Sequence, residues 1–187
     1  MKTNTKDYIK HYKGVMPNKL CDQTIVELQT AEYQQHQFYN AKDNIIRPRS
    51  GAQELDITNT EIPSKNKFMD ALWPILKKHV DDLDMPWFSG WSGYSRIRFN
   101  RYKENRKMAL HADHIQSIFD GEKKGIPILS ILGVLNNDYE GGEFYLIDDI
   151  IDLKKGDVII FPSNFMYPHK VEPVTKGTRY SYISWVW

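Results

Sequence analysis

The chain has 187 residues, of which 41% are hydrophobic and 26% are charged. This is the composition and size of about one globular domain. Lysine and arginine number 25 against 24 aspartates and glutamates. The near-neutral balance argues against binding to nucleic acid or to an anionic membrane through bulk charge.

Cysteine content and hydropathy indicate the expected cellular setting. Cys21 is the one cysteine, so no disulfide can form within the chain, and a cytoplasmic location is expected. The first residues are polar and lack the apolar segment of a signal peptide. The longest apolar stretch, residues 125–135, has about half the length needed to span a bilayer. No membrane association is therefore expected.

The first half of the sequence predicts two helices, over residues 18–38 and 65–81. Apolar residues recur every four positions in the second one and share a face: Phe68, Leu72, Leu76 and Val80. Pro74 lies inside this pattern and should bend or interrupt the helix. Residues 40–63 are polar and irregular, which predicts a loop that can include a short strand.

From about residue 93 the pattern changes to short strands divided by turn residues. The predicted strands are 94–102, 108–113, 128–136, 143–147, 151–153, 157–162, 169–174 and 178–187. Eight short strands that follow helices, and do not alternate with them, are typical of a sandwich or barrel. The sequence therefore predicts a mainly β fold with N-terminal helices. Its core is a jelly roll, or double-stranded β-helix.

This pattern predicts a single domain over residues 1–187. Residues 1–92 form a helical and irregular supporting layer, and residues 93–187 form the β core. Within the core, Gly141 and Gly142 separate two predicted strands, which favours a tight hairpin turn.

His111 and Asp113 form an H-x-D pair on a predicted strand. Side chains two positions apart on a strand point the same way, so an imidazole and a carboxylate project together. His169 begins another predicted strand and can supply a third ligand. Two histidines and one carboxylate are the ligand set of non-haem Fe(II) oxygenases.

The alternative interpretation is that these are ordinary surface residues, because an H-x-D pair on its own is a weak signal. The sequence has six histidines in all. His114 follows Asp113 on the predicted strand and should point to the opposite face. The three in the first half are expected on the surface or on a helix face: His11, His36 and His79.

A second group of polar residues favours the functional interpretation. Arg179 follows His169 by ten residues and Ser181 follows Arg179 by two, so a guanidinium and a hydroxyl share one face of the last strand. An arginine fork binds both oxygens of a carboxylate. Tyr102, at the end of the first core strand, can add a phenolic hydroxyl. A surface salt bridge is the alternative role for Arg179, but the rest of its strand reads as buried.

These motifs together resemble a known family. The segment PHKVEPVTKGTRYSYISW is similar to the C-terminal signature of 2-oxoglutarate- and Fe(II)-dependent dioxygenases of the prolyl 4-hydroxylase type. The segments FNRY, HAD and LNNDYEGGEF occur in the same order in that superfamily. The resemblance covers roughly residues 94–187 and is strongest to small bacterial and phage members.

The resemblance implies the roles of the polar residues. It implies that His111, Asp113 and His169 bind the catalytic iron. Arg179 and Tyr102 would hold the distal carboxylate of 2-oxoglutarate, and Ser181 would assist them. It further implies O2 as the second cosubstrate and stimulation by ascorbate. Val134 stands where some prolyl hydroxylases have a second tyrosine, which makes the pocket wall more apolar.

The alternation of side chains along the strands also predicts residues that contact the substrate. If Tyr102 faces the pocket, so do Asn100, Arg98 and Arg96. These residues would contact substrate, or else form a solvated face. On the same strands, Ile97 and Phe99 should face the helices, and Trp185 should be a pocket wall or a core residue.

Two polar segments, 40–63 and 114–127, are long enough to cover the site as lids. Trp87 and Trp91 precede the first core strand, where they would anchor the helical layer or contact a peptide.

By resemblance, the expected reaction is hydroxylation of a substrate C–H bond, with a prolyl residue of a peptide or protein as the first choice. A free amino acid or another small metabolite is the alternative. A nucleic-acid demethylase is less favoured, because Trp185 stands where such an enzyme carries a second arginine. Asp113 argues against a halogenase, and the third alternative is a jelly-roll binding module without activity. The sequence does not assign an oligomeric state.

Overall fold

The computed structural model describes residues 4–40, 42, 45–84, 93–113 and 127–187. The expectations for Trp87, Trp91, His114 and nearly all of the lid over 114–127 fall outside the described residues.

Two α-helices precede most of the strands: α1 (Asn18–Leu28) and α2 (Lys65–Leu83). Two short 3-10 helices accompany them, Thr5–Tyr8 and Gly51–Gln53. The predicted second helix is confirmed, and Pro74 does not interrupt it.

The predicted first helix is wrong beyond Leu28. The chain there becomes extended and forms β2 (Gln34–Gln35) and β3 (Phe38–Asn40). His36 and Phe38 are buried while Gln37 between them is exposed. Burial that alternates with a period of two is typical of an extended segment packed against the interior and not of a helix.

The strands form two main sheets, and every strand pair in them is antiparallel. The large sheet has the order β1 (Lys10–Tyr12), β12 (Val158–Pro162), β8 (Leu129–Val134), β15 (Arg179–Val186), β6 (Arg98–Tyr102), β5 (Asp56–Thr58), β2. The small sheet has the order β11 (Asp149–Ile151), β10 (Phe144–Leu146), β13 (His169–Val171), β7 (Met108–His111). Two further pairs are β14 (Val174–Gly177) with β9 (Tyr139–Gly141), and β3 with β4 (Ile45–Arg47).

The predicted mainly β fold with a jelly-roll core is confirmed. The first half contributes more than a supporting layer, because β1, β2 and β5 join the large sheet. The predicted hairpin at Gly141 and Gly142 is wrong. β9 pairs with β14, whereas β10 pairs with β11 and β13, so the glycines turn the chain from one sheet to another. Both have positive φ, 74° and 68°, which glycine adopts most easily.

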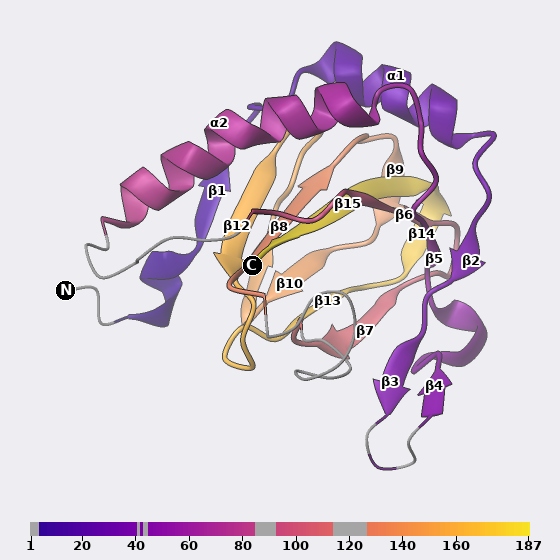
Figure 1. The fold of residues 1–187 in the computed structure, drawn as a ribbon. Helices are drawn as coiled ribbons and strands as arrows, with labels where there is room; N and C mark the ends of the chain where they lie inside the picture. The colour runs from indigo at the N-terminus through magenta and orange to yellow at the C-terminus, as the bar shows by residue number, and fades with distance from the viewer. Residues whose placement is uncertain (1–3, 41, 43–44, 85–92, 114–126) are drawn as a thin grey trace.

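Two apolar cores position the site between the sheets. α1 and α2 cover the outer face of the large sheet (Figure 1), where Phe68 of α2 meets Tyr182 of β15 with ring centroids 4.5 Å apart. Ile97 and Phe99 belong to this outer core, as predicted. A second core between the sheets includes Tyr102. Alternate residues of β6, β8 and β15 therefore face the interior of the jelly roll.

No helix in the described part of the chain combines the length and the apolar character that a membrane span requires.

Candidate active site

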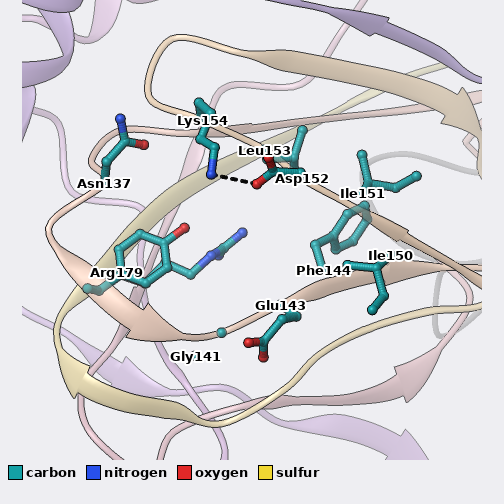
Figure 2. Close-up of a pocket in the computed structure, with 12 residues that line it drawn as sticks. Asn137, Gly141, Glu143, Phe144, Ile150, Ile151, Asp152, Leu153, Lys154 and Arg179 are labelled. Atoms are coloured by element: carbon teal, nitrogen blue, oxygen red, sulfur yellow. Dashed lines mark ion pairs between the residues drawn. The ribbon is translucent and has the colours of Figure 1, made fainter.

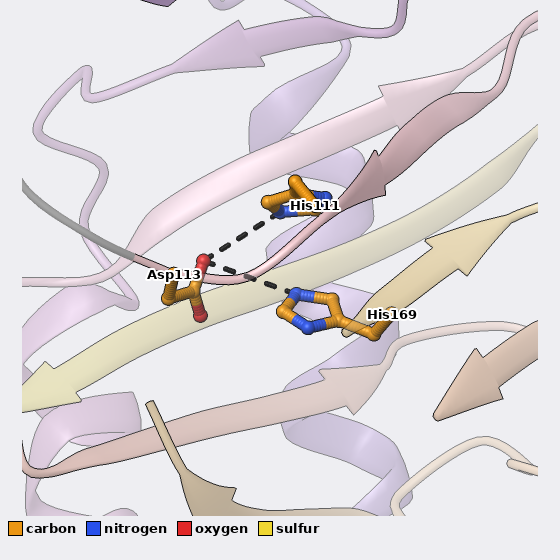
Figure 3. Close-up of side chains that lie close together, drawn as sticks. All are labelled: His111, Asp113 and His169. Atoms are coloured by element: carbon orange, nitrogen blue, oxygen red, sulfur yellow. Dashed lines mark ion pairs between the residues drawn. The ribbon is translucent and has the colours of Figure 1, made fainter. Parts of the chain in front are cut away.

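Strand pairing in the small sheet brings the three predicted metal ligands together (Figure 3). His111 ends β7 and lies directly opposite His169, the first residue of β13. Asp113 follows two residues after His111. Its Oδ1 lies 3.6 Å from Nε2 of His111 and 3.8 Å from Nε2 of His169. All three side chains are buried, and one ligand atom from each lies within 4.8 Å of the others.

Backbone carbonyls fix the orientation of both imidazoles. Nδ1 of His111 lies 2.8 Å from the carbonyl oxygen of Ala109, and Nδ1 of His169 lies 3.1 Å from that of Tyr167. A carbonyl can only accept a hydrogen bond, so each Nδ1 carries the proton. Each Nε2 is therefore directed at Asp113 and at the space between the three residues.

The carboxylate of Asp113 is held from its other side. Ser130 of β8 donates to Oδ2 of Asp113 at 2.5 Å, and Ser163 lies 2.8 Å from the Ser130 hydroxyl. Burial acts to raise the pKa of Asp113, but His169, His111 and Ser130 together lower it well below its usual range. Burial, followed by the neighbouring His111, lowers the pKa of His169 to about 4. The site thus holds one carboxylate and a neutral His169, and metal binding needs its ligands in these states.

The spacing fits a divalent transition metal. Such ions sit about 2.0–2.2 Å from histidine and carboxylate ligands, so two ligands of one ion lie at most about 4.4 Å apart. The distances from Asp113 to both imidazoles are within that limit. Three ligands on one side of an ion leave its other positions open.

A cavity of about 270 Å³ lies beside the triad. Arg98 and Trp185 line it, as strand alternation predicted. Asn100 is buried in the large sheet but is not among the residues that line this cavity. The expectation that Arg96 faces the pocket is wrong, because Arg96 is exposed and pairs with Glu61 at 2.7 Å. It lies before the first residue of β6, where regular alternation does not apply.

Residues that sequence reasoning missed form another wall of the cavity: His36, Gln37, Phe38 and Ile46. The Phe38 ring meets the His111 ring at 5.2 Å and the His36 ring at 4.5 Å. Burial, followed by the neighbouring Arg98, lowers the pKa of His36 to about 3. The signal that could have found this wall is the alternation of buried and exposed residues after α1. Ile46 lies in the segment 40–63, which was expected to cover the site.

The other histidines are expected on the surface or on a helix face: His79 does lie on α2, whereas His36 is buried outside any helix. His36 is 7% exposed and His79 is fully buried. His11 is partly buried and lies 2.8 Å from Asp157. Each gains a neighbour from an element distant in sequence, which local patterns do not reveal.

Arg179 lines a different cavity, of about 350 Å³, and Figure 2 shows its guanidinium directed into that space. The side chain is 1% exposed, and its Nε and Nη1 have no hydrogen-bond partner among the described residues. Its Cζ lies 5.0 Å from the centre of the Tyr102 ring. Tyr102 and Ser181 are neighbours of Arg179 in the large sheet, and both are buried. A buried guanidinium with unpaired donors fits an anionic ligand such as a carboxylate.

Comparison with known proteins agrees with this geometry. A model of the 2OG-Fe(II) oxygenase superfamily matches residues 97–187. A PKHD-type hydroxylase of Idiomarina loihiensis is 34% identical over 96 residues, which cover 49% of this chain and 42% of that protein. One from Aliarcobacter butzleri is 30% identical over 162 residues, covering 81% of this chain and 63% of that protein. The chain thus matches only part of the length of these relatives.

Solved structures share the fold across nearly the whole chain. A viral collagen prolyl hydroxylase from Paramecium bursaria Chlorella virus-1 superposes with a TM-score of 0.65 at 15% identity, covering 96% of this chain and 94% of that one. A prolyl hydroxylase of Trichoplax adhaerens, solved with a peptide of a hypoxia inducible factor, gives a TM-score of 0.71 at 16% identity. It covers 97% of this chain and 84% of the Trichoplax chain. Residues 97–187, which carry the triad and Arg179, therefore match the 2OG-Fe(II) oxygenase superfamily, and the chain shares its fold with prolyl hydroxylases.

Proposed function

We propose that the protein is an oxygenase that uses Fe(II), 2-oxoglutarate and O2 to hydroxylate a C–H bond of its substrate. The observation that carries this proposal is the buried triad of His111, Asp113 and His169, with its ligand atoms within 4.8 Å of one another. These residues would hold Fe(II). When bound, the iron with its two cosubstrates supplies an oxidant able to attack an unactivated C–H bond, with succinate and CO2 as coproducts.

The protein's own residues prepare this site. The carbonyls of Ala109 and Tyr167 keep each Nδ1 protonated, so that Nε2 is free to bind metal. Ser130 holds one oxygen of Asp113, which leaves the other directed at the imidazoles. Less energy is then lost in arranging the ligands when the ion binds.

Arg179 is the proposed partner of the distal carboxylate of 2-oxoglutarate. Its buried and unpaired Nε and Nη1 would each gain a charge-assisted hydrogen bond. Tyr102 and Ser181, beside it in the large sheet, would bind the same carboxylate through their hydroxyls. Val134 lies opposite Ser181 and gives this region an apolar wall.

A prolyl residue is the proposed substrate group, in a peptide or protein. The support is the likeness to prolyl hydroxylases in fold and in the signature around His169. Trp185 offers a partly exposed aromatic ring at the triad cavity, which suits a small apolar ring. Arg98, and Asn100 further along the strand, are the proposed polar contacts. A free amino acid is the second candidate, and the cation in this cavity favours it.

The test combines iron binding with a substrate screen. Under anaerobic conditions the protein should bind one Fe(II) per chain, and His111→Ala should abolish binding. Arg179→Ala should spare iron but raise the 2-oxoglutarate requirement sharply, because breaking a buried charged pair typically costs roughly 2–5 kcal/mol.

The screen supplies O2 and compares proline-rich peptides, free L-proline and a methylated oligonucleotide. Succinate formation and the product mass are followed. Gain of one oxygen atom on a prolyl substrate supports the proposal. Oxidation of the oligonucleotide alone would contradict it.

A further inference from the structure

Arg98 is a cation placed inside the triad cavity. It is the first residue of β6 and lines the cavity together with His111 and Asp113. Its Cζ lies 5.0 Å from the centre of the Trp185 ring. Its Nε is buried and has no hydrogen-bond partner among the described residues. The ring supports one face of the guanidinium plane and leaves the N–H edge available for a ligand.

Asp113 is the one acidic residue among the described residues that line this cavity, and its oxygens are engaged elsewhere. Its Oδ1 faces both imidazoles, and its Oδ2 accepts the hydrogen bond of Ser130. Burial lowers the pKa of Arg98, and the nearby Asp113 only partly opposes this effect. A partly buried charge of this kind is retained at a cost, which is typical of a residue that binds a ligand.

The cosubstrate does not account for this cation. Under the proposed function, the charges of Fe(II), Asp113, 2-oxoglutarate and Arg179 cancel. Arg98 then leaves one uncompensated positive charge at the position where substrate must enter. One carboxylate on the substrate would neutralise it, and a carboxylate is the group that a guanidinium fork binds best.

The geometry points to Arg98 as the residue that binds a carboxylate of the substrate. The substrate is accordingly an amino acid with a free α-carboxylate next to the hydroxylated ring, either alone or at the C-terminus of a peptide. This inference rests on the proposed function, and it makes the charge on the substrate a determinant of specificity.

Matched pairs of compounds test the inference. L-Proline is compared with L-prolinamide, and a peptide that ends in proline is compared with its C-terminal amide. Binding is measured by calorimetry on the protein loaded anaerobically with Fe(II) and 2-oxoglutarate. At least one acid should bind at least tenfold more tightly than its amide. Arg98→Gln should weaken the acid at least tenfold and leave the amide unchanged, and Arg98→Lys should lie between.

Arg96→Gln is the matched control, because Arg96 is an exposed arginine two residues away that pairs with Glu61. It should keep the preference for acids. Equal binding of acid and amide, or no binding of either member in both pairs, would overturn the inference. An equal loss for both members in Arg98→Gln would also overturn it and would indicate a structural role.

Two further readouts separate this inference from the proposed function. Arg98→Gln should retain iron binding and an unchanged affinity for 2-oxoglutarate. If it instead raises the 2-oxoglutarate requirement while the acid preference persists, Arg98 serves the cosubstrate and the inference fails. If the wild-type protein forms no succinate with any substrate, the proposed function fails, and the binding comparison still decides the role of Arg98.

Discussion

One hydrogen bond of Ser130 helps to fix the geometry of the whole triad. It holds Oδ2 of Asp113 at 2.5 Å and is itself contacted by Ser163. In Ser130→Ala the carboxylate loses this restraint, and partners of metal ligands typically contribute about 10–100-fold to metal affinity. We expect a loss of that size in the affinity for Fe(II), measured anaerobically, with the fold retained.

Ser184→Ala is the control for this prediction. Ser184 is also fully buried in the large sheet, but its hydroxyl donates to the carbonyl of Ser95. It should leave metal affinity unchanged. Equal affinities for the Ser130 and Ser184 variants would show that the restraint on Asp113 is unimportant.

His36 makes stability depend on pH. Burial lowers its pKa from 6.5 to about 3, so the unfolded chain takes up a proton below pH 6.5 that the folded chain refuses. Stability should therefore fall as pH drops from 6.5 toward 3, by up to about 1.4 kcal/mol per pH unit for this group. His36→Gln should flatten the slope in urea unfolding between pH 7 and 5. A slope identical to that of the wild type would mean that His36 takes up protons equally in the folded and unfolded chain.

At the scale of single residues, the triad and Arg179 can be predicted because short sequence motifs mark them. Two ligands are two positions apart on a strand, and Arg179 belongs to a motif. His36 could not be predicted in the same way. It reaches the cavity only because the chain leaves α1 at Leu28, where the sequence pattern allowed the helix to continue.

At the scale of elements, the packing of α2 on the large sheet is the contact most open to test. Phe68 is fully buried and meets both Tyr182 and Phe99. Phe68→Ala should lower the free energy of unfolding by about 3–5 kcal/mol, because it leaves a cavity between helix and sheet. Val26→Ala, at a position of α1 that is 64% exposed, should cost less than about 0.5 kcal/mol. Urea unfolding of both variants measures these free energies, and an equally small loss in both would contradict the prediction for Phe68.

The predictable elements are those with a strong internal period. Helix α2 has one, because its apolar residues recur about every four positions. Strands β1, β2 and β5 have only two or three residues each, and pairing with the large sheet stabilises them more than their own sequence does. The turn at Gly141 and Gly142 is equally hard to predict. Two glycines permit a sharp turn, but they do not specify with which strands the flanking segments pair.

The whole molecule should be stabilised by its metal. An ion that binds only the folded state adds about 2.7 kcal/mol at a concentration of 100 times its Kd. Adding Fe(II) anaerobically should raise the melting temperature of the wild type. His169→Ala should show no such rise, although its metal-free stability can differ from that of the wild type. A rise of equal size in the variant would place the ion elsewhere.

At the scale of the molecule, the number and order of strands predict the jelly roll, but they do not predict how the strands are divided between sheets. That division depends on contacts far apart in sequence, such as the pairing of β8 with β15. It also places Arg179 in the large sheet and His111 and His169 in the small one.

The hydrogen bond from Ser130 to Asp113 links the two sheets, because Ser130 belongs to the large sheet and Asp113 follows the end of β7 in the small sheet by two residues. A chain whose sheets have not yet come together therefore lacks a fully formed metal site. Newly made or damaged molecules would hold iron poorly. Under the proposed function, the oxidation of substrate would then be confined to molecules that have finished folding.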